Sequence, residues 1–129
     1  MKEPIFAPDL PRPKPPYSPA VRLPAGSHVV FASGQLGMDP VSGELAKGIE
    51  AQTEQALRNL AAILEAAGAS LATVVKANVY LKDMNDFERM NEVYGRVFPQ
   101  PYPARTAVEV ARLPRDAMIE IEAVALTEE

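Results

Sequence analysis

Residues 74–81 read VVKANVYL, a short run in which side chains of different character alternate. Because successive side chains of an extended chain point to opposite faces, one face is expected to carry Val75, Ala77, Val79 and Leu81. The other face then carries Val74, Lys76, Asn78 and Tyr80. The pattern predicts a β-strand with one face turned toward an apolar core.

An amphipathic helix is predicted on each side of this strand. Apolar and small residues recur at spacings of three and four between Ile49 and Ala67, and Gly68 stands where a helix commonly ends. Asn85 and Glu88 have the spacing of a capping box and are expected to begin the second helix. Its apolar stripe consists of Phe87, Met90, Val93, Tyr94, Val97 and Phe98.

Further strands are predicted before the first helix and after the second. Residues 28–33 form an apolar run that ends at Gly34, and the turn residues at 39–43 predict a hairpin. Two more alternating runs occupy residues 105–110 and 118–125. The expected order is βββ-α-β-α-ββ, which describes an α+β domain with a mixed sheet and two helices packed on one face.

The two faces of this sheet are expected to differ. The face under the helices is the purely apolar one, formed by Val75, Val79, Ile119 and Ile121. The opposite face combines charged and apolar groups, namely Tyr80, Arg105, Ala107, Glu109, Met118, Glu120, Glu122 and Val124. Such a face is too apolar for water and too charged for an ordinary core, so we expect a subunit interface that contains polar pockets.

Residues 1–24 form a proline-rich arm. Each proline fixes φ and removes an N–H donor, so residues 8–19 are expected to be extended rather than helical or part of a central strand. Composition alone also fits a disordered leader. Tyr17, followed by the apolar Ala20 and Val21, favours an arm that is tied to the domain.

Length and composition limit the remaining possibilities. The 129 residues are expected to form one domain that includes the arm. The chain has no cysteine and one histidine, His28, which excludes a disulfide framework, a thiol nucleophile and a two-histidine metal site. Its net charge of −4 argues against an electrostatic nucleic-acid binder. Since there is no long apolar run and no secretory start, we expect a cytoplasmic protein without a membrane partner.

Six groups of short motifs stand in order along the chain. They are YS at 17–18, ASGQ at 32–35, NDF at 85–87 with NEVY at 91–94, PAR at 103–105, VEVARLP at 108–114, and IEIEA at 119–123. Together they resemble the RidA/YjgF family, the reactive-intermediate enamine/imine deaminases, from about Phe6 to Leu126. Each motif is weak alone, and their common order over nearly the full length makes the resemblance specific.

The resemblance implies a chorismate-mutase-like fold and a homotrimer with its sites in the clefts between subunits. It also implies hydrolysis of reactive 2-imino acids, such as those formed from 2-aminoacrylate, to 2-oxo acids and ammonia, with neither cofactor nor metal. Position by position, the carboxylate-binding arginine corresponds to Arg105 and the catalytic acidic residue to Glu120. The other substrate-binding residues correspond to Tyr17, Ser33 and Asn91.

The chemistry of these side chains fits the reaction independently of the resemblance. A planar guanidinium binds a carboxylate through two parallel hydrogen bonds, so Arg105 can fix the adjacent C=N group of a 2-imino acid. Glu120 can hold the attacking water and carry a proton to the departing nitrogen. Because the imine is already labile, positioning alone supplies much of the acceleration that is needed.

Each assignment has a structural alternative. In this alternative, Arg105 is an ion-pairing arginine, and Glu120 or Glu122 forms a salt bridge at the subunit interface. Tyr17 then only packs the arm, and Ser33 and Asn91 are ordinary strand-end and helix positions. Two other functions also stay open. One is a non-catalytic trimer that binds small carboxylates, and the other is a ribonuclease or translation inhibitor with a basic patch of Arg105, Arg112 and Arg115.

Three positions depart from the better-known family members. Ala107 stands where cysteine is frequent, Pro19 where glutamine is frequent, and Pro16 where glycine is frequent. Imine hydrolysis does not require the thiol, so these changes concern substrate preference more than reaction type.

Overall fold

The computed structural model describes residues 1–12 and 14–127. Its strands are β1 (Glu3–Ile5), β2 (Ala20–Arg22), β3 (Val29–Leu36), β4 (Val74–Leu81), β5 (Ala104–Glu109) and β6 (Ile119–Leu126). Its α-helices are α1 (Ile49–Ala66) and α2 (Phe87–Val97), and the short 3₁₀ turns are η1 (Leu71–Thr73), η2 (Met84–Asp86) and η3 (Pro114–Asp116). No helix in the described part of the chain is long and apolar enough to cross a membrane.

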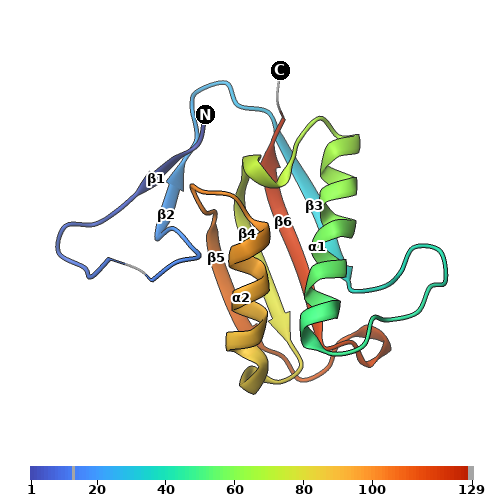
Figure 1. Cartoon of the computed structure of the whole chain (residues 1–129). Coiled ribbons are helices and arrows are strands. Elements are labelled where there is room, and N and C mark those ends of the chain that lie inside the picture. The colour runs from blue at the N-terminus through green and yellow to red at the C-terminus, as the bar shows by residue number, and fades with distance from the viewer. Residues whose placement is uncertain (13, 128–129) are drawn as a thin grey trace.

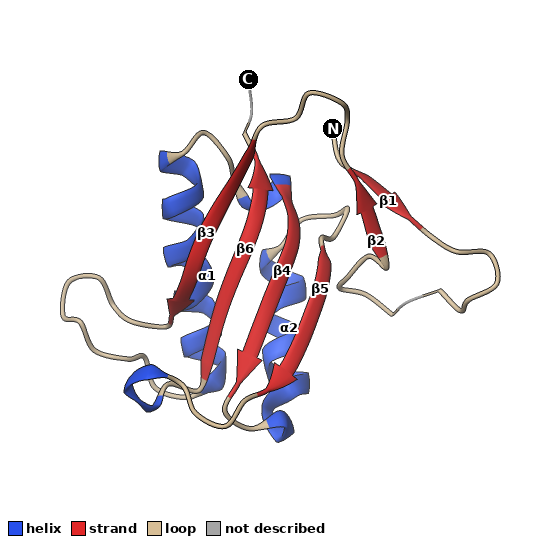
Figure 2. Cartoon of the chain, turned by 180° about the vertical axis from the view of Figure 1, so that it is seen from behind, coloured by secondary structure: helices blue, strands red, loops and turns tan. Residues whose placement is uncertain are grey.

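The main sheet has four strands in the order β3-β6-β4-β5. β4 and β5 run parallel because α2 connects them as a crossover, whereas β6 is antiparallel to both of its neighbours. Both helices cover the same face of the sheet, and the other face is left open (Figures 1 and 2). The predicted α+β domain with two helices on one face of a mixed sheet is confirmed.

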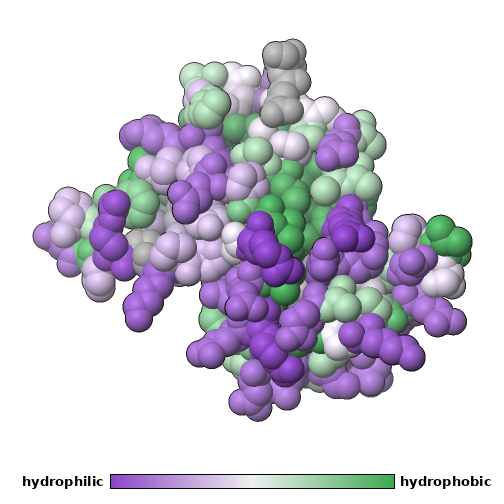
Figure 3. Space-filling view, viewed as in Figure 1, coloured by the Kyte–Doolittle hydropathy of each residue, from purple (hydrophilic) through white to green (hydrophobic). Residues whose placement is uncertain are grey.

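The hydrophobic core lies between the sheet and the two helices. Its fully buried side chains include Leu57, Leu60 and Leu64 of α1, Tyr94 of α2, Val79 of β4, and Ile119 and Ile121 of β6. Seen from the helix side, the surface is largely hydrophilic, and apolar residues show mainly between the two helices (Figure 3). The helices therefore turn their apolar stripes inward, as predicted.

Two details of the predicted core and caps are wrong. An irregularity in the pairing of β4 with β6 between Val74 and Lys76 places Val74, rather than Val75, in the core cluster. The start of α2 is also capped differently. The Asp83 carboxylate accepts the backbone N–H of Asn85 at 2.9 Å, and η2 then leads into the helix without the predicted capping box of Asn85 and Glu88.

Strand β5 turns the opposite way from our prediction. Its parallel register pairs Arg105 with Ala77 and Ala107 with Val79, and residues paired across a sheet share a face. Ala77 and Val79 belong to the core, so Arg105, Ala107 and Glu109 lie on the helix side, and Thr106 and Val108 lie on the open face. A polar residue is tolerated on the helix side here because β5 is the edge strand.

The N-terminal arm supplies two of the three strands that precede α1. β1 and β2 pair with each other as a separate small sheet, and the proline-rich loop between them projects from the body (Figure 1). The predicted hairpin at 39–43 is reduced to a turn closed by one bridge, Met38 to Leu45. β3, by contrast, continues through Gly34 to Leu36. The number of strands was therefore predicted correctly, but two of them were placed in the wrong segment.

Candidate functional site

Arg105 is the centre of one cluster of predicted site residues. It lies near the start of β5, under α2, and its guanidinium donates a hydrogen bond to Asn91 Oδ1 at 2.5 Å. Three aromatic rings surround the guanidinium carbon, with ring centroids at 4.8 Å for Tyr94 and 5.6 Å for both Tyr17 and Phe87. The structure thus brings together Arg105, Asn91 and Tyr17, three of the residues that the resemblance assigns to the site.

Two elements hold these partners in place. Phe87, Asn91 and Tyr94 follow the spacing i, i+4, i+7 along α2, so the helix presents all three on one stripe. Tyr17 is fixed by the residue beside it. The Ser18 N–H donates to the Pro103 carbonyl at 3.0 Å, and the Ser18 hydroxyl donates to the Tyr102 carbonyl. The arm is therefore attached to the start of β5 directly beside Arg105. Residues 17 and 18 are thus part of the folded domain and not of a disordered leader.

The guanidinium of Arg105 is half-buried and has no acidic partner among the described residues. Burial lowers the pKa of Arg105, while the neighbouring Tyr94 and Tyr17 raise it. An arginine side chain stays charged under these conditions. It carries five N–H donors, of which the hydrogen bond to Asn91 uses one. A partly desolvated cation with free donors is suited to bind an anion, and a carboxylate matches its fork geometry.

Tyr94 was predicted only as a core residue. Its ring lies under the Arg105 guanidinium and against Phe98, with ring centroids 4.4 Å apart. Its hydroxyl is buried without a hydrogen-bond partner among the described residues, and burial strongly raises its pKa. The helical spacing from Asn91 is a sequence signal that could have placed Phe87 and Tyr94 next to the site, but our prediction did not use it.

Glu120, on β6, lies apart from this cluster, beside the segment of β3 that contains Ser33 and Gly34. Glu120 lies against Gly34, the residue that follows Ser33, so closely that a Cβ built on Gly34 would lie 2.8 Å from the Glu120 carboxyl carbon. The Glu120 side chain is half-buried, and no hydrogen bond satisfies its carboxylate within the described part of the chain. The carboxylate is therefore available to bind water or a ligand.

Glu122, two residues further along β6, has its own partners. Its Oε2 accepts hydrogen bonds from Asn78 Nδ2 and from the Tyr80 hydroxyl, each at 2.9 Å. The hydrogen bond from Tyr80, together with burial, raises the pKa of that tyrosine. The structure thus separates the two glutamates: Glu122 stabilises the open face of the sheet, and Glu120 is unpaired.

One chain does not bring Arg105 and Glu120 together. Arg105 pairs with Ala77, which pairs in turn with Ala123, three residues from Glu120 along β6. Because three is an odd number of positions along a strand, Arg105 and Glu120 lie on opposite faces of the sheet. The helix-side cluster of Tyr17, Asn91 and Arg105 is therefore separate from Glu120, which lies on the open face next to the segment of β3 that contains Ser33.

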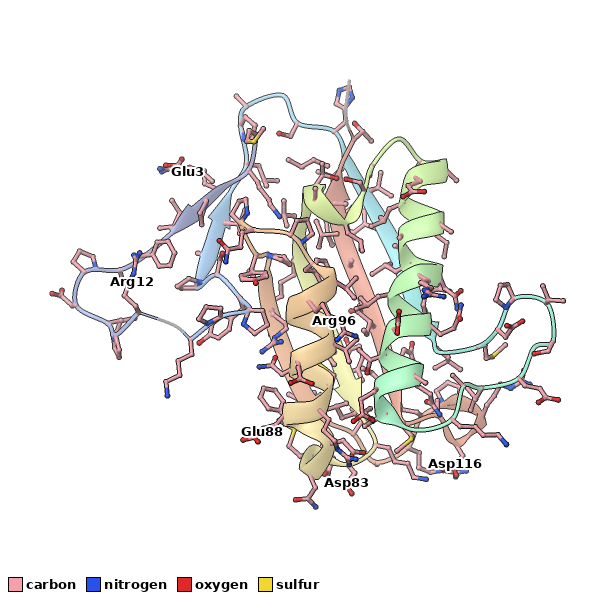
Figure 4. The ribbon with its side chains drawn as sticks, in the orientation of Figure 1. Glu3, Arg12, Asp83, Glu88, Arg96 and Asp116 are labelled. Atoms are coloured by element: carbon pink, nitrogen blue, oxygen red, sulfur yellow. The ribbon has the colours of Figure 1, made fainter. Side chains whose placement is uncertain are left out.

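Two other expectations concern basic and metal-binding groups. Arg112 and Arg115 line a cavity of about 540 Å³ beyond the far end of β5, so they do not form a patch with Arg105. Figure 4 shows Asp116, from the same loop, at the end of the molecule where Asp83 and Glu88 also lie. Among the described residues, no three His, Cys, Asp or Glu side chains form a group able to hold a metal ion.

Comparison with known proteins gives consistent matches over nearly the whole chain. The family model for Endoribonuclease L-PSP matches residues 8–127. A RutC family protein of Pyrococcus horikoshii is 54% identical over 129 residues, covering 99% of this chain and 100% of the relative. The human 2-iminobutanoate/2-iminopropanoate deaminase is 47% identical over 112 residues, covering 86% of this chain and 80% of the relative. The crystal structure of E. coli TdcF with bound serine is 38% identical, with a TM-score of 0.75, and covers 98% of this chain and 99% of that one.

The fold and the Arg105 cluster define a class: a small α+β protein with two helices over a mixed sheet and a half-buried arginine, packed among aromatic rings, at the sheet edge. The comparisons define the family. The chain belongs to the RidA/YjgF/RutC family, whose model bears the name Endoribonuclease L-PSP.

Proposed function

We propose that this protein hydrolyses reactive 2-imino acids to 2-oxo acids and ammonia. The observation that carries the proposal is Arg105, a half-buried cation without an acidic partner in the described chain, held by Asn91 and by aromatic rings. A 2-imino acid supplies the missing carboxylate. The name of the human relative as an imine deaminase and the serine bound to TdcF support a substrate related to amino acids.

The proposed site spans two subunits of a homotrimer. Arg105 and Glu120 lie on opposite faces of one chain, so a single site that contains both requires the Glu120 face of a second copy. The open face is suited to such a contact because it carries exposed apolar residues, with Phe31 80%, Val108 40% and Val29 39% exposed. The trimeric stoichiometry follows from the family resemblance.

The proposed reaction needs only these residues and water. Arg105 binds the substrate carboxylate and fixes the planar C=N group, with Asn91 and Tyr17 holding the guanidinium. Glu120 of the neighbouring copy accepts a proton from water as the water oxygen bonds to the imine carbon. With the imine nitrogen protonated, this step gives the neutral carbinolamine. The same proton then passes from Glu120 to nitrogen, the C–N bond breaks and ammonia leaves, while the hydroxyl group gives its proton to Glu120 and the C=O bond forms. Transfer of that last proton to ammonia restores the Glu120 carboxylate. Ser33 precedes Gly34, the residue that lies against Glu120, and is assigned to substrate binding.

The reaction is tested with 2-iminopropanoate generated in place and mixed at once with the protein. Ammonia release should be faster than the spontaneous rate and should scale with protein concentration. Release at the spontaneous rate, together with tight binding of 2-oxobutanoate, would favour the non-catalytic carboxylate binder. Cleavage of RNA without imine hydrolysis would favour the activity in the family model's name.

A further inference from the structure

Gly34 is the residue of β3 that lies closest to the Glu120 carboxylate. A Cβ added at Gly34 would overlap Glu120 Oε2, and it would lie 2.8 Å from Cδ and 3.0 Å from Cγ of the same side chain. The backbone of Gly34 is outside the left-handed region, so conformation alone does not require glycine here. What the position requires is the absence of a side chain.

The strand is irregular at this point. β3 and β6 pair regularly up to Ala32, the register shifts before Gln35, and Leu36 then pairs with Glu120. Bulges of this kind bend a strand and change the direction of nearby side chains. Ser33 and Gly34 form the irregular step, and the Glu120 side chain lies across it.

The contact at Gly34 differs from that at Gly37, three residues later. A Cβ at Gly37 would lie 2.6 Å from the backbone Cα of Gln52 in α1, so this glycine allows the helix to pack on the chain that follows β3. At Gly34 the three nearest heavy atoms all belong to the flexible, half-buried side chain of Glu120. A methyl group at position 34 therefore moves a carboxylate, whereas one at position 37 moves backbone.

We propose that Gly34 is a positioning residue, which leaves room for the Glu120 carboxylate to lie across the bulge of β3 and so determines where that carboxylate holds water. The proposal rests on the proposed function in one respect, the use of Glu120 to handle the attacking water. Its geometric part, that Gly34 sets the place of the carboxylate, does not depend on the reaction.

The test is Gly34→Ala, measured in three ways. Turnover of 2-iminopropanoate should fall about 10- to 100-fold, the loss expected when a catalytic group is displaced by about 1 Å. The KM, the binding of 2-oxobutanoate at Arg105, the melting temperature and the state of assembly should stay at their wild-type values. The ¹³Cδ resonance of Glu120, assigned through Glu120→Gln, should shift in Gly34→Ala.

A Glu120→Ala background provides the matched control, because no long side chain remains for the new methyl group to displace. Adding Gly34→Ala to Glu120→Ala should cause no further loss of turnover. An equal loss in both backgrounds, or an unchanged Glu120 resonance in Gly34→Ala, would overturn the proposal. If the wild-type protein released no ammonia above the spontaneous rate, the deaminase function would fail, and the Glu120 resonance would still decide whether Gly34 places the carboxylate.

Discussion

At the scale of single residues, the chemistry of Arg105 depends on what surrounds it. Aromatic faces attract the guanidinium without neutralising it, and Asn91 uses one donor while leaving the charge intact. A neighbouring carboxylate would instead occupy the fork that a ligand needs. The aromatic rings and the amide thus keep the cation both fixed and unpaired.

Arg105→Ala is expected to abolish imine hydrolysis while the fold and assembly are retained. Arg105→Lys should recover little activity, because an ammonium group cannot reproduce the planar fork or stack on Tyr94 in the same way. Ammonia release and binding of 2-oxobutanoate measure the loss. Full activity in Arg105→Ala would mean that the substrate carboxylate binds elsewhere.

The two glutamates of β6 should respond differently to the same substitution. Glu120→Gln is expected to lower turnover by about 10²- to 10⁴-fold, because the amide cannot accept the proton, while 2-oxobutanoate still binds. Glu122→Gln should leave turnover nearly unchanged and destabilise the fold by about 1–2 kcal/mol, since two hydrogen bonds to a charged group are weakened.

The pKa of Tyr80 provides a separate measurement for Glu122→Gln. Its pKa is raised by the hydrogen bond to Glu122 and by burial, so Glu122→Gln should lower that pKa in a spectroscopic titration. Both glutamate variants are compared at a protein concentration at which each is fully assembled. Wild-type turnover in Glu120→Gln would show that Arg105 and backbone groups orient the water without a general base.

Tyr94→Phe is expected to stabilise the free protein. The Tyr94 hydroxyl is buried with no hydrogen-bond partner in the described structure, and such a group costs about 1–3 kcal/mol. Phenylalanine keeps the ring under Arg105 and removes this cost, so the free energy of unfolding in urea should rise by about 1 kcal/mol. A loss of stability would reveal a hydrogen bond to this hydroxyl.

At the scale of elements, the N-terminal arm is fastened at both ends. Ser18 joins it to the chain that enters β5, and the buried Lys2 amine donates to the Val74 carbonyl at 2.6 Å. Burial lowers the pKa of Lys2 from 10.5 to about 8. The folded protein therefore binds this proton less tightly than the unfolded chain does, and the charged form opposes folding below about pH 8.

This linkage predicts that the difference in unfolding free energy between the wild type and Lys2→Met depends on pH. As the pH rises from about 8 to 10.5, the wild type should gain up to ~3 kcal/mol of unfolding free energy relative to the variant. Urea unfolding across this range measures the difference. Lys14→Met, at an exposed lysine of the same arm, controls for the loss of one positive charge. A difference that does not change with pH would contradict the assignment to Lys2.

At the scale of the whole molecule, the separation of Arg105 and Glu120 predicts a specific behaviour of mixed assemblies. Arg105→Ala and Glu120→Gln chains are each expected to be inactive alone. Mixed in equal amounts and allowed to exchange subunits, they should recover about a quarter of wild-type turnover, because half of the sites receive an intact Arg105 and half of those an intact Glu120. No recovery after demonstrated exchange would place both residues of a working site in one chain.

Assembly itself is tested at Phe31, whose side chain is 80% exposed on the open face. Phe31→Asp should leave the fold of the chain intact, because Phe31 is not part of the core, but it should prevent the apolar contact between copies. Light scattering should give about three chain masses for the wild type and one for the variant, which should also lose turnover. A wild-type monomer that hydrolyses the imine would contradict the site between subunits.

The sequence by itself determined the two helices and the four strands of the main sheet, but not the two short strands of the arm. The spacing of the apolar residues predicted the positions of α1, α2, β4 and β6 closely. A helix or strand that buries one face carries apolar residues at a regular interval, and this interval is visible in the sequence. The family motifs also named the candidate site residues, and the structure brings three of them, Tyr17, Asn91 and Arg105, close together.

Only the tertiary structure decided which way β5 faces and which residues lie together. Alternation divides Arg105 and Thr106 between two faces, but it cannot say which face the helices cover. The crossover through α2 fixes the parallel register with β4, and that register turns Arg105 toward α2. It also places Arg105 and Glu120 on opposite faces, because the direction of each side chain is set by pairing between strands far apart in the sequence.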